Sequence, residues 1–369
     1  MRVRKKGVAT NLNSLVIFCC MCTGTNIIEP KKTPQGGSSL DTLAQLRHFP
    51  ENGVKTLRKR ARAKYLTDHV VFYLNNEEDN TLKNSYWNSY HCAKVIQQEG
   101  GKLTAKYCNN RWCMVCNRIR TAKAIRGYMP QIAKMTEPRF VTLTRPNVKG
   151  DELEQEIESL TKAMRLLTKQ MRVTAQTPLY GLRKLEVTYN HREDTYHPHF
   201  HLIIEGEEVA QEAIKRWLKM NPNASYKAQD ERPIDSPQEA IELFKYFTKI
   251  ATKIRKENGE ELSIIHAPSL NIIFKAMRGK RVLQPMGGMR KVNVDVEEIR
   301  SEVYEELEQE ENLSWIYDTP LGDWIDRTTG ETLTGYTPSD KFSKWIGTDN
   351  FEGKYAQIEI ENAHKDHSK

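Results

Sequence analysis

The sequence lacks several features that would assign it to a class at once. No stretch approaches the ~20 apolar residues that a membrane-spanning helix needs, so we expect no membrane contact. Cysteine is scarce and odd in number, seven residues in 369, which argues against a disulfide framework. No repeat of solenoid period is present. Hydrophobic residues still make up 38% of the chain, enough for two domains with their own cores.

Acidic residues are almost missing from one part of the chain. Residues 101–150 contain eleven Lys or Arg and one acidic residue, Glu137, although the net charge of the whole chain is only +8. This block suits a polyanionic partner such as nucleic acid, and a solvated basic face would explain it too. Residues 295–318 show the opposite bias, with ten Asp or Glu against Arg300.

The N-terminal residues give weak signals of export. Basic residues precede the apolar run LVIFCCMC at 15–22, but this run is short and no small-residue cleavage site follows it. Residues 30–40 (PKKTPQGGSSL) have the composition of a linker. We therefore expect residues 1–54 to be a disordered leader and linker, and the protein to remain in the cytoplasm.

Periodicity indicates an α+β fold. Apolar residues at alternating spacings of three and four predict a helix that Asp151 caps, with Glu154 completing the capping box. The sequence Ser236-Pro237-Gln238-Glu239 predicts the start of another helix, running to about Ile254. Strands are predicted at 139–144, 185–189 and 197–204, the last two joined by the turn NHRED. Hairpin-linked strands with separate helices predict a central antiparallel sheet flanked by helices.

Histidine is rare, ten residues in all, yet three alternate in YHPHFHLII at 196–204. Alternate residues of a strand share a face, so His197, His199 and His201 should point the same way. Two imidazoles on one face can hold a divalent cation, and Glu186 on the preceding strand would add a carboxylate if the turn sets that register. Such a set suits Mn²⁺ or Mg²⁺. A half-exposed strand with its polar residues outward is the simpler alternative.

A tyrosine lies on the polar side of the helix expected over 237–254. Glu242, Tyr246 and Lys249 gather along one line of that helix at about 100° per residue. A nearby cation and a metal-polarised target favour the phenolate, which makes Tyr246 a candidate nucleophile. Taken alone, the pattern fits a solvated helix face with an incidental tyrosine just as well.

Three cysteines follow the spacing C-x4-C-x2-C, namely Cys108, Cys113 and Cys116. With Cys92 or His91 as the fourth ligand, they would satisfy tetrahedral zinc. An iron–sulfur cluster and free buried thiols are the alternatives. Five cations surround the triplet: Arg111, Arg118, Arg120, Lys123 and Arg126. A structural Zn²⁺ would then fold a small module that presents these cations to DNA phosphates.

These motifs together resemble the HUH endonuclease superfamily, which combines a His–hydrophobic–His strand with a Tyr-x-x-Lys helix. More narrowly, the chain resembles the rolling-circle replication initiators of small bacterial plasmids. Four blocks carry the likeness in the order those proteins use: YCNNRWCMVCNRIR, RFVTLT, LEVTYNHREDTYHPHFHLII and ELFKYFTK. The resemblance covers about residues 86–290.

The resemblance implies roles for individual residues. His199 and His201 would be the metal-binding histidines, and Glu186 the acidic ligand of the same catalytic Mn²⁺ or Mg²⁺. Tyr246 would be the catalytic tyrosine and Lys249 its assisting lysine. Glu242 would activate water in the terminating cleavage, as a glutamate does in some initiators. His197 has no assigned role and would orient the site or face solvent.

The resemblance also implies an activity and the nuclease domain, while composition sets the other expected regions. We expect a basic region with a four-cysteine zinc module at 55–130, a nuclease domain of the HUH fold at 131–292 and, from its acidic residues and amphipathic spacing, an acidic helical region at 293–369. The protein would nick single-stranded or hairpin plasmid origin DNA through a phosphotyrosine intermediate. The free 3′-OH would prime a host DNA polymerase, with a host helicase, in the bacterial cytoplasm. A relaxase or transposase of the same superfamily, or a non-catalytic zinc-dependent DNA-binding regulator, are the alternatives.

Overall fold

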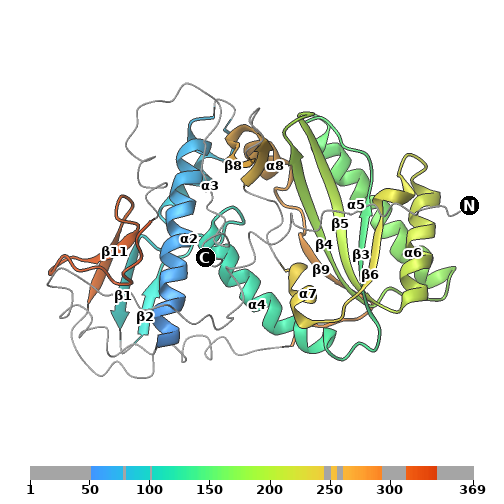
Figure 1. Ribbon diagram of the computed structural model, residues 1–369, viewed down its shortest axis with the longest axis horizontal. Coiled ribbons are helices and arrows are strands. Elements are labelled where there is room, and N and C mark those ends of the chain that lie inside the picture. The colour runs from blue at the N-terminus through green and yellow to red at the C-terminus, as the bar shows by residue number, and fades with distance from the viewer. Residues whose placement is uncertain are drawn as a thin grey trace, which may run out of the picture.

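A computed structural model describes residues 51–77, 80–99, 102–244, 251–255, 261–292 and 313–338. Figure 1 shows a five-stranded sheet with its helices at one end of the molecule and a smaller sheet beside a long helix at the other. No helix among these residues is long and apolar enough to cross a membrane. The expected leader, residues 1–54, lies almost entirely outside the described residues.

The larger sheet is antiparallel throughout and has the strand order β6-β3-β5-β4-β9. Its strands are β3 (Pro138–Thr144), β4 (Gly181–Asn190), β5 (Thr195–Glu205), β6 (Asp230–Pro233) and β9 (Leu283–Met286). The turn between β4 and β5 covers His191–Asp194, as the run NHRED predicts. The prediction of an α+β fold with a central antiparallel sheet and flanking helices is confirmed.

One face of this sheet packs against α5 (Leu153–Val173) and α6 (Glu207–Met220), and α8 (Ala267–Ala276) packs on α5. The predicted apolar stripe of α5 is fully buried, and its members are Leu153, Ile157, Leu160, Met164, Leu167 and Met171. The predicted cap is wrong: the N-cap residue is Glu152, not Asp151, and no side chain caps the helix. The Glu152 carboxylate instead accepts a hydrogen bond from the Lys149 amide at 3.2 Å.

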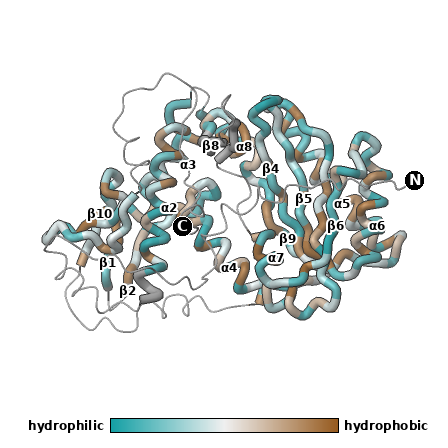
Figure 2. The backbone as a smooth tube through the Cα atoms, in the orientation of Figure 1, coloured by the Kyte–Doolittle hydropathy of each residue, from teal (hydrophilic) through white to brown (hydrophobic). Residues whose placement is uncertain are grey.

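The other face is polar at one end and apolar at the other. At the apolar end, Phe140, Leu182 and Ile203 pack against α4 (Met114–Ile132) and α7 (Pro237–Glu242). Figure 2 shows hydrophobic positions where α4 and α7 approach β9. The polar end carries the alternating histidines of β5, so both sets of residues belong to one face of the same strands.

The helix predicted from Ser236 begins as expected and ends early. Ser236 Oγ accepts the Glu239 amide and Pro237 is the first helical residue, but α7 stops at Glu242. Residues 245–250 lie outside the described part of the chain. Where the helix was expected to continue, β7 (Ala251–Arg255) pairs with β8 (Glu261–Ile265). The prediction of a helix to Ile254 is therefore wrong, because Thr252 and Ile254 of this β-branched segment pair with Ile264 and Leu262 across the strands.

The smaller sheet joins distant parts of the sequence. Its order is β11-β10-β1-β2, from β1 (Val95–Glu99), β2 (Lys102–Ala105), β10 (Ser314–Asp318) and β11 (Asp323–Asp326). It lies beside α2 (Glu51–Asn75) and α3 (Lys83–Tyr90). Residues 313–338 thus form strands, which corrects the expectation of a helical region for this part of 293–369. Buried aromatics explain the difference, since Tyr317 and Trp324 are 1% and 0% exposed.

Candidate active site

Glu186, His199 and His201 meet on the polar end of the larger sheet. Strand register places Glu186 directly opposite His199, because the turn of the β4–β5 hairpin has the length that this pairing needs. One ligand atom from each of the three residues lies within 4.8 Å of the others, and the facing Nε2 atoms of His199 and His201 are 3.0 Å apart. The three residues can therefore hold a metal ion.

Each of these three side chains also contacts a second polar group of the protein. The hydroxyl oxygen of Thr142 lies 3.1 Å from His201 Nδ1, and the His197 carbonyl oxygen lies 2.9 Å from His199 Nδ1. Lys184 donates a hydrogen bond of 2.7 Å to Oε2 of Glu186. Such partners fix the tautomer and orientation of metal ligands. Nε2 of both histidines and one oxygen of Glu186 are thereby directed at the space between them.

The ionisation states of Glu186 and His201 suit metal ligands. Burial alone would raise the pKa of Glu186, but Lys184, His199 and His201 outweigh it and lower that pKa to about 2. Burial and the nearby His199 lower the pKa of His201 to about 3. At neutral pH the triad thus offers the Glu186 carboxylate and the neutral His201 imidazole, the forms in which these groups bind metals.

His197 stands apart from the triad. Its ring lies 4.9 Å from that of His199, its Nε2 contacts the Thr144 hydroxyl, and burial followed by His199 lowers its pKa to about 4. Its backbone carbonyl, rather than its imidazole, contacts the His199 ring. Of the two roles expected for His197, the geometry fits orientation of the site.

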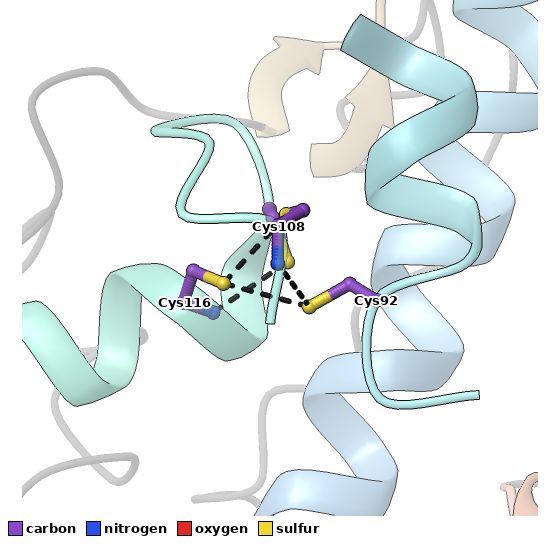
Figure 3. A group of neighbouring side chains, drawn as sticks. Cys92, Cys108 and Cys116 are labelled. Carbon is purple, nitrogen blue, oxygen red and sulfur yellow. Dashed lines mark hydrogen bonds between the residues drawn. The ribbon is translucent and has the colours of Figure 1, made fainter. Parts of the chain in front are cut away.

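The four cysteines form a second group that could bind a metal. Cys92 follows α3, Cys108 lies in the loop after β2, and Cys113 and Cys116 lie at the start of α4. Figure 3 shows the thiols of Cys92, Cys108 and Cys116 converging. Cys116 Sγ lies 3.5 Å from Cys92 Sγ and 3.6 Å from Cys108 Sγ. Tetrahedral zinc with Zn–S bonds of about 2.3 Å separates its sulfurs by about 3.8 Å, so the set fits zinc.

Backbone amides also point at these sulfurs, as expected for thiolates. Cys116 Sγ accepts the Asn109 amide at 3.2 Å, and Cys108 Sγ accepts the Asn110 amide at 3.4 Å. Hydrogen bonds with the other thiols, Cys113 first, lower the pKa of Cys108. His91, the alternative fourth ligand, is exposed and stacks on Trp87, while Cys92 is buried within the group.

The cations around this group are only partly available to a ligand. Arg111 donates to the Met277 carbonyl oxygen at 3.2 Å, and burial lowers its pKa. Arg120 donates to the Asn109 carbonyl oxygen at 2.7 Å, within the cysteine loop. Both guanidiniums therefore stabilise the local fold.

Tyr246 and Lys249 lie outside the described residues. Glu242, the last residue of α7, is half-buried. Two residues later, Phe244 packs in one cluster with Phe140, whose ring lies 5.3 Å from that of His201. The chain that leads to Tyr246 thus departs from the same sheet face that carries the triad.

Comparison with known proteins assigns the family. The family model described as "Replication protein" (Rep_1) matches residues 102–319. The chain belongs to this family, the replication proteins of rolling-circle plasmids. A "Protein rep" from Staphylococcus aureus is 33% identical to this replication protein over 221 residues, which are 56% of this chain and 86% of the relative.

Other relatives of the same name match shorter stretches. A "Protein rep" of a Bacillus species is 38% identical over 128 residues, 31% of this chain and 40% of the relative. That of Streptococcus pneumoniae is 35% identical over 125 residues, 30% of this chain and 37% of the relative. The replication protein thus covers less than half of these two relatives. No solved structure matches it significantly.

Lys184 and Thr142 were missed as members of the site. Both were within reach of the sequence, since Lys184 shares a strand face with Glu186 by the two-residue period and Thr142 lies in the predicted strand RFVTLT. Their pairing with His201 follows from the register, which periodicity alone does not give.

Proposed function

We propose that this replication protein nicks one strand of plasmid origin DNA and becomes covalently joined to it through Tyr246. The observation that carries the proposal is the buried triad of Glu186, His199 and His201 in a chain of the replication-protein family. The neighbouring position of Phe244, two residues before Tyr246, supports it.

The proposed reaction is an in-line displacement at one phosphodiester. The Tyr246 oxygen bonds to phosphorus, the bond from phosphorus to the 3′ oxygen breaks, and the products are a 5′-phosphotyrosine and a free 3′-OH. The phenol loses its proton to solvent and the leaving oxygen takes one up. A divalent cation held by the triad would supply positive charge that polarises the phosphate.

The remaining residues have supporting roles in this proposal. Lys249 stabilises the phenolate, and Glu242 acts as general base for the water of the terminating cleavage. The 3′-OH serves as the primer for a host DNA polymerase, with a host helicase opening the duplex. The replication-protein match favours this activity over that of a relaxase or transposase, and the bacterial relatives support a bacterial host.

The four cysteines are proposed to hold a structural Zn²⁺ that folds the module at the start of α4. Lys123 and Arg126 lie on α4 beyond the cysteines and would contact DNA phosphates. In the alternative function, a zinc-dependent DNA-binding regulator, this module would be sufficient and Tyr246 would be dispensable.

A covalent-adduct assay tests the proposal. Wild type with Mn²⁺ and labelled single-stranded origin DNA should give a cut product and a protein–DNA band on a denaturing gel. Both should disappear with Tyr246→Phe and with EDTA. The matched control is Tyr226→Phe, because Tyr226 is 76% exposed, and it should react like wild type. DNA binding without an adduct under any divalent metal would leave the regulator as the function.

A further inference from the structure

Helix α4 starts inside the four-cysteine group. Cys113 is its N-cap residue, and Cys113 Sγ accepts the Cys116 amide at 3.5 Å. A capping side chain satisfies an amide that the first turn of a helix leaves unpaired, so the cysteine group defines where α4 begins and how it is directed. From there the helix continues for 19 residues, about 28 Å, toward the larger sheet.

The C-terminal half of α4 packs against the larger sheet. Its residues Ala124, Ile125 and Tyr128 pack on the apolar cluster that covers the apolar end of the sheet face. The Gly127 carbonyl oxygen accepts the Val292 amide at 2.9 Å. The Lys291 side chain also lies against Gly127, where an added Cβ would come within 2.4 Å of it.

Helix α4 contacts the chain at the end of α7 just before Tyr246, the proposed nucleophile. Thr121 donates from its hydroxyl to the Phe244 carbonyl oxygen at 3.2 Å. The α7 helix has only six residues, and the last carbonyls of a helix lack partners within it. A helix this short is marginal by itself, so its end is held in place by packing and by the Thr121 hydrogen bond.

We propose that α4 couples the four-cysteine site to the proposed active site, with Thr121 as the positioning residue for the chain that carries Tyr246. The inference rests on the function proposed above, and gives the zinc site a role beyond presenting cations to DNA. The four-cysteine group sets the start of α4, α4 holds Phe244 through Thr121, and Phe244 lies two residues before Tyr246 in the sequence.

This arrangement predicts which step is affected when the coupling is broken. Misplacement of a reacting group by about 1 Å can cost about 100-fold in rate without weakening substrate binding. Loss of the Thr121 hydroxyl should therefore lower the rate of adduct formation at saturating DNA. A module that only contacts DNA would instead lower the affinity and leave the saturated rate unchanged.

The test is single-turnover adduct formation by Thr121→Val at increasing concentrations of single-stranded origin DNA with Mn²⁺. The saturated rate should fall about 10-fold or more, with half-saturation within about twofold of wild type, and Thr121→Ser should restore the rate. The matched control is Thr168→Val, since Thr168 also donates to a backbone carbonyl, but within its own helix α5. An unchanged saturated rate, or a change in half-saturation alone, overturns the proposal.

Hydrogen exchange tests the zinc end of the coupling without any reaction. Removal of zinc should speed the exchange of the amides of residues 237–244, while those of α5 keep their protection. Unchanged exchange in 237–244 would overturn the coupling. A wild type that forms no adduct at all refutes the proposed function instead, so the two failures are distinguishable.

Discussion

Replacing Lys184 by methionine should destabilise the metal-free protein far more than the loss of an ordinary surface lysine. The Lys184 and Glu186 side chains are only 3% and 11% exposed, and their ion pair measures 2.7 Å. Methionine keeps the length of the side chain and removes the charge, which leaves a buried carboxylate without its closest cation. Breaking a buried pair in this way costs about 3–5 kcal/mol.

The pKa of Glu186 gives a second route to the same magnitude. It falls from 4.5 to about 2 against the opposing effect of burial, and Lys184 is the first of the groups that lower it. At about 1.4 kcal/mol for each pKa unit, this depression corresponds to about 3 kcal/mol of stability, of which Lys184 supplies only a part beside His199 and His201. A carboxylate with a depressed pKa stabilises the fold above pH ~4.5, and this contribution is lost as the pH falls toward 2. The difference between wild type and variant should shrink over the same interval.

Urea denaturation at pH ~7, without added Mn²⁺ or Mg²⁺, measures the effect. Lys215→Met is the matched control, because Lys215 is 81% exposed in its ion pair with Glu212 and should cost under about 1 kcal/mol. Added Mn²⁺ should recover more stability in Lys184→Met than in wild type, since a bound dication would balance the Glu186 charge. Equal losses for the two lysines would refute this account of the site.

Two further predictions concern the smaller sheet and the cysteines. Trp324→Ala should cost about 3–5 kcal/mol in thermal or urea unfolding, because Trp324 is fully buried and donates to the Ala93 carbonyl oxygen at 2.8 Å. As a control, Leu321→Ala, at a residue 53% exposed, should change stability by under about 0.5 kcal/mol. Equal effects of the two substitutions would contradict the docking of β11. Cys108→Ser should lower the zinc bound per chain, measured by metal analysis of the purified protein, and full zinc retention would exclude Cys108 as a ligand.

The sequence was most informative where a short-range rule decides the structure. Alternation placed His199 and His201 on one face, and the short turn after β4 brought Glu186 opposite His199. The replication-protein family followed from motifs in the same region. Lys184 was overlooked because a lysine is seldom buried, and only its partner Glu186 explains why this one is.

Strand pairing produced the errors. The helical periodicity after Ser236 was real for the six residues of α7, but β7 pairs with β8 as a hairpin, which the Asn258-Gly259 sequence between them could have indicated. Likewise β10 pairs with β1, which lies far earlier in the chain, with Ile316 opposite Val95. The acidic residues at 295–311 suggested a helix and gave no sign of the strands that follow.

The pairing of β10 with β1 also sets an order of events during synthesis. The larger sheet has all of its strands once Met286 has left the ribosome, whereas the smaller sheet is complete only after residues 313–338 have followed. At about 5–20 residues per second, that interval is roughly 3–10 s. During it, the edge of β1 that later pairs with β10 has no partner strand, so a nascent chain is more exposed to aggregation or proteolysis at the smaller sheet than at the larger one.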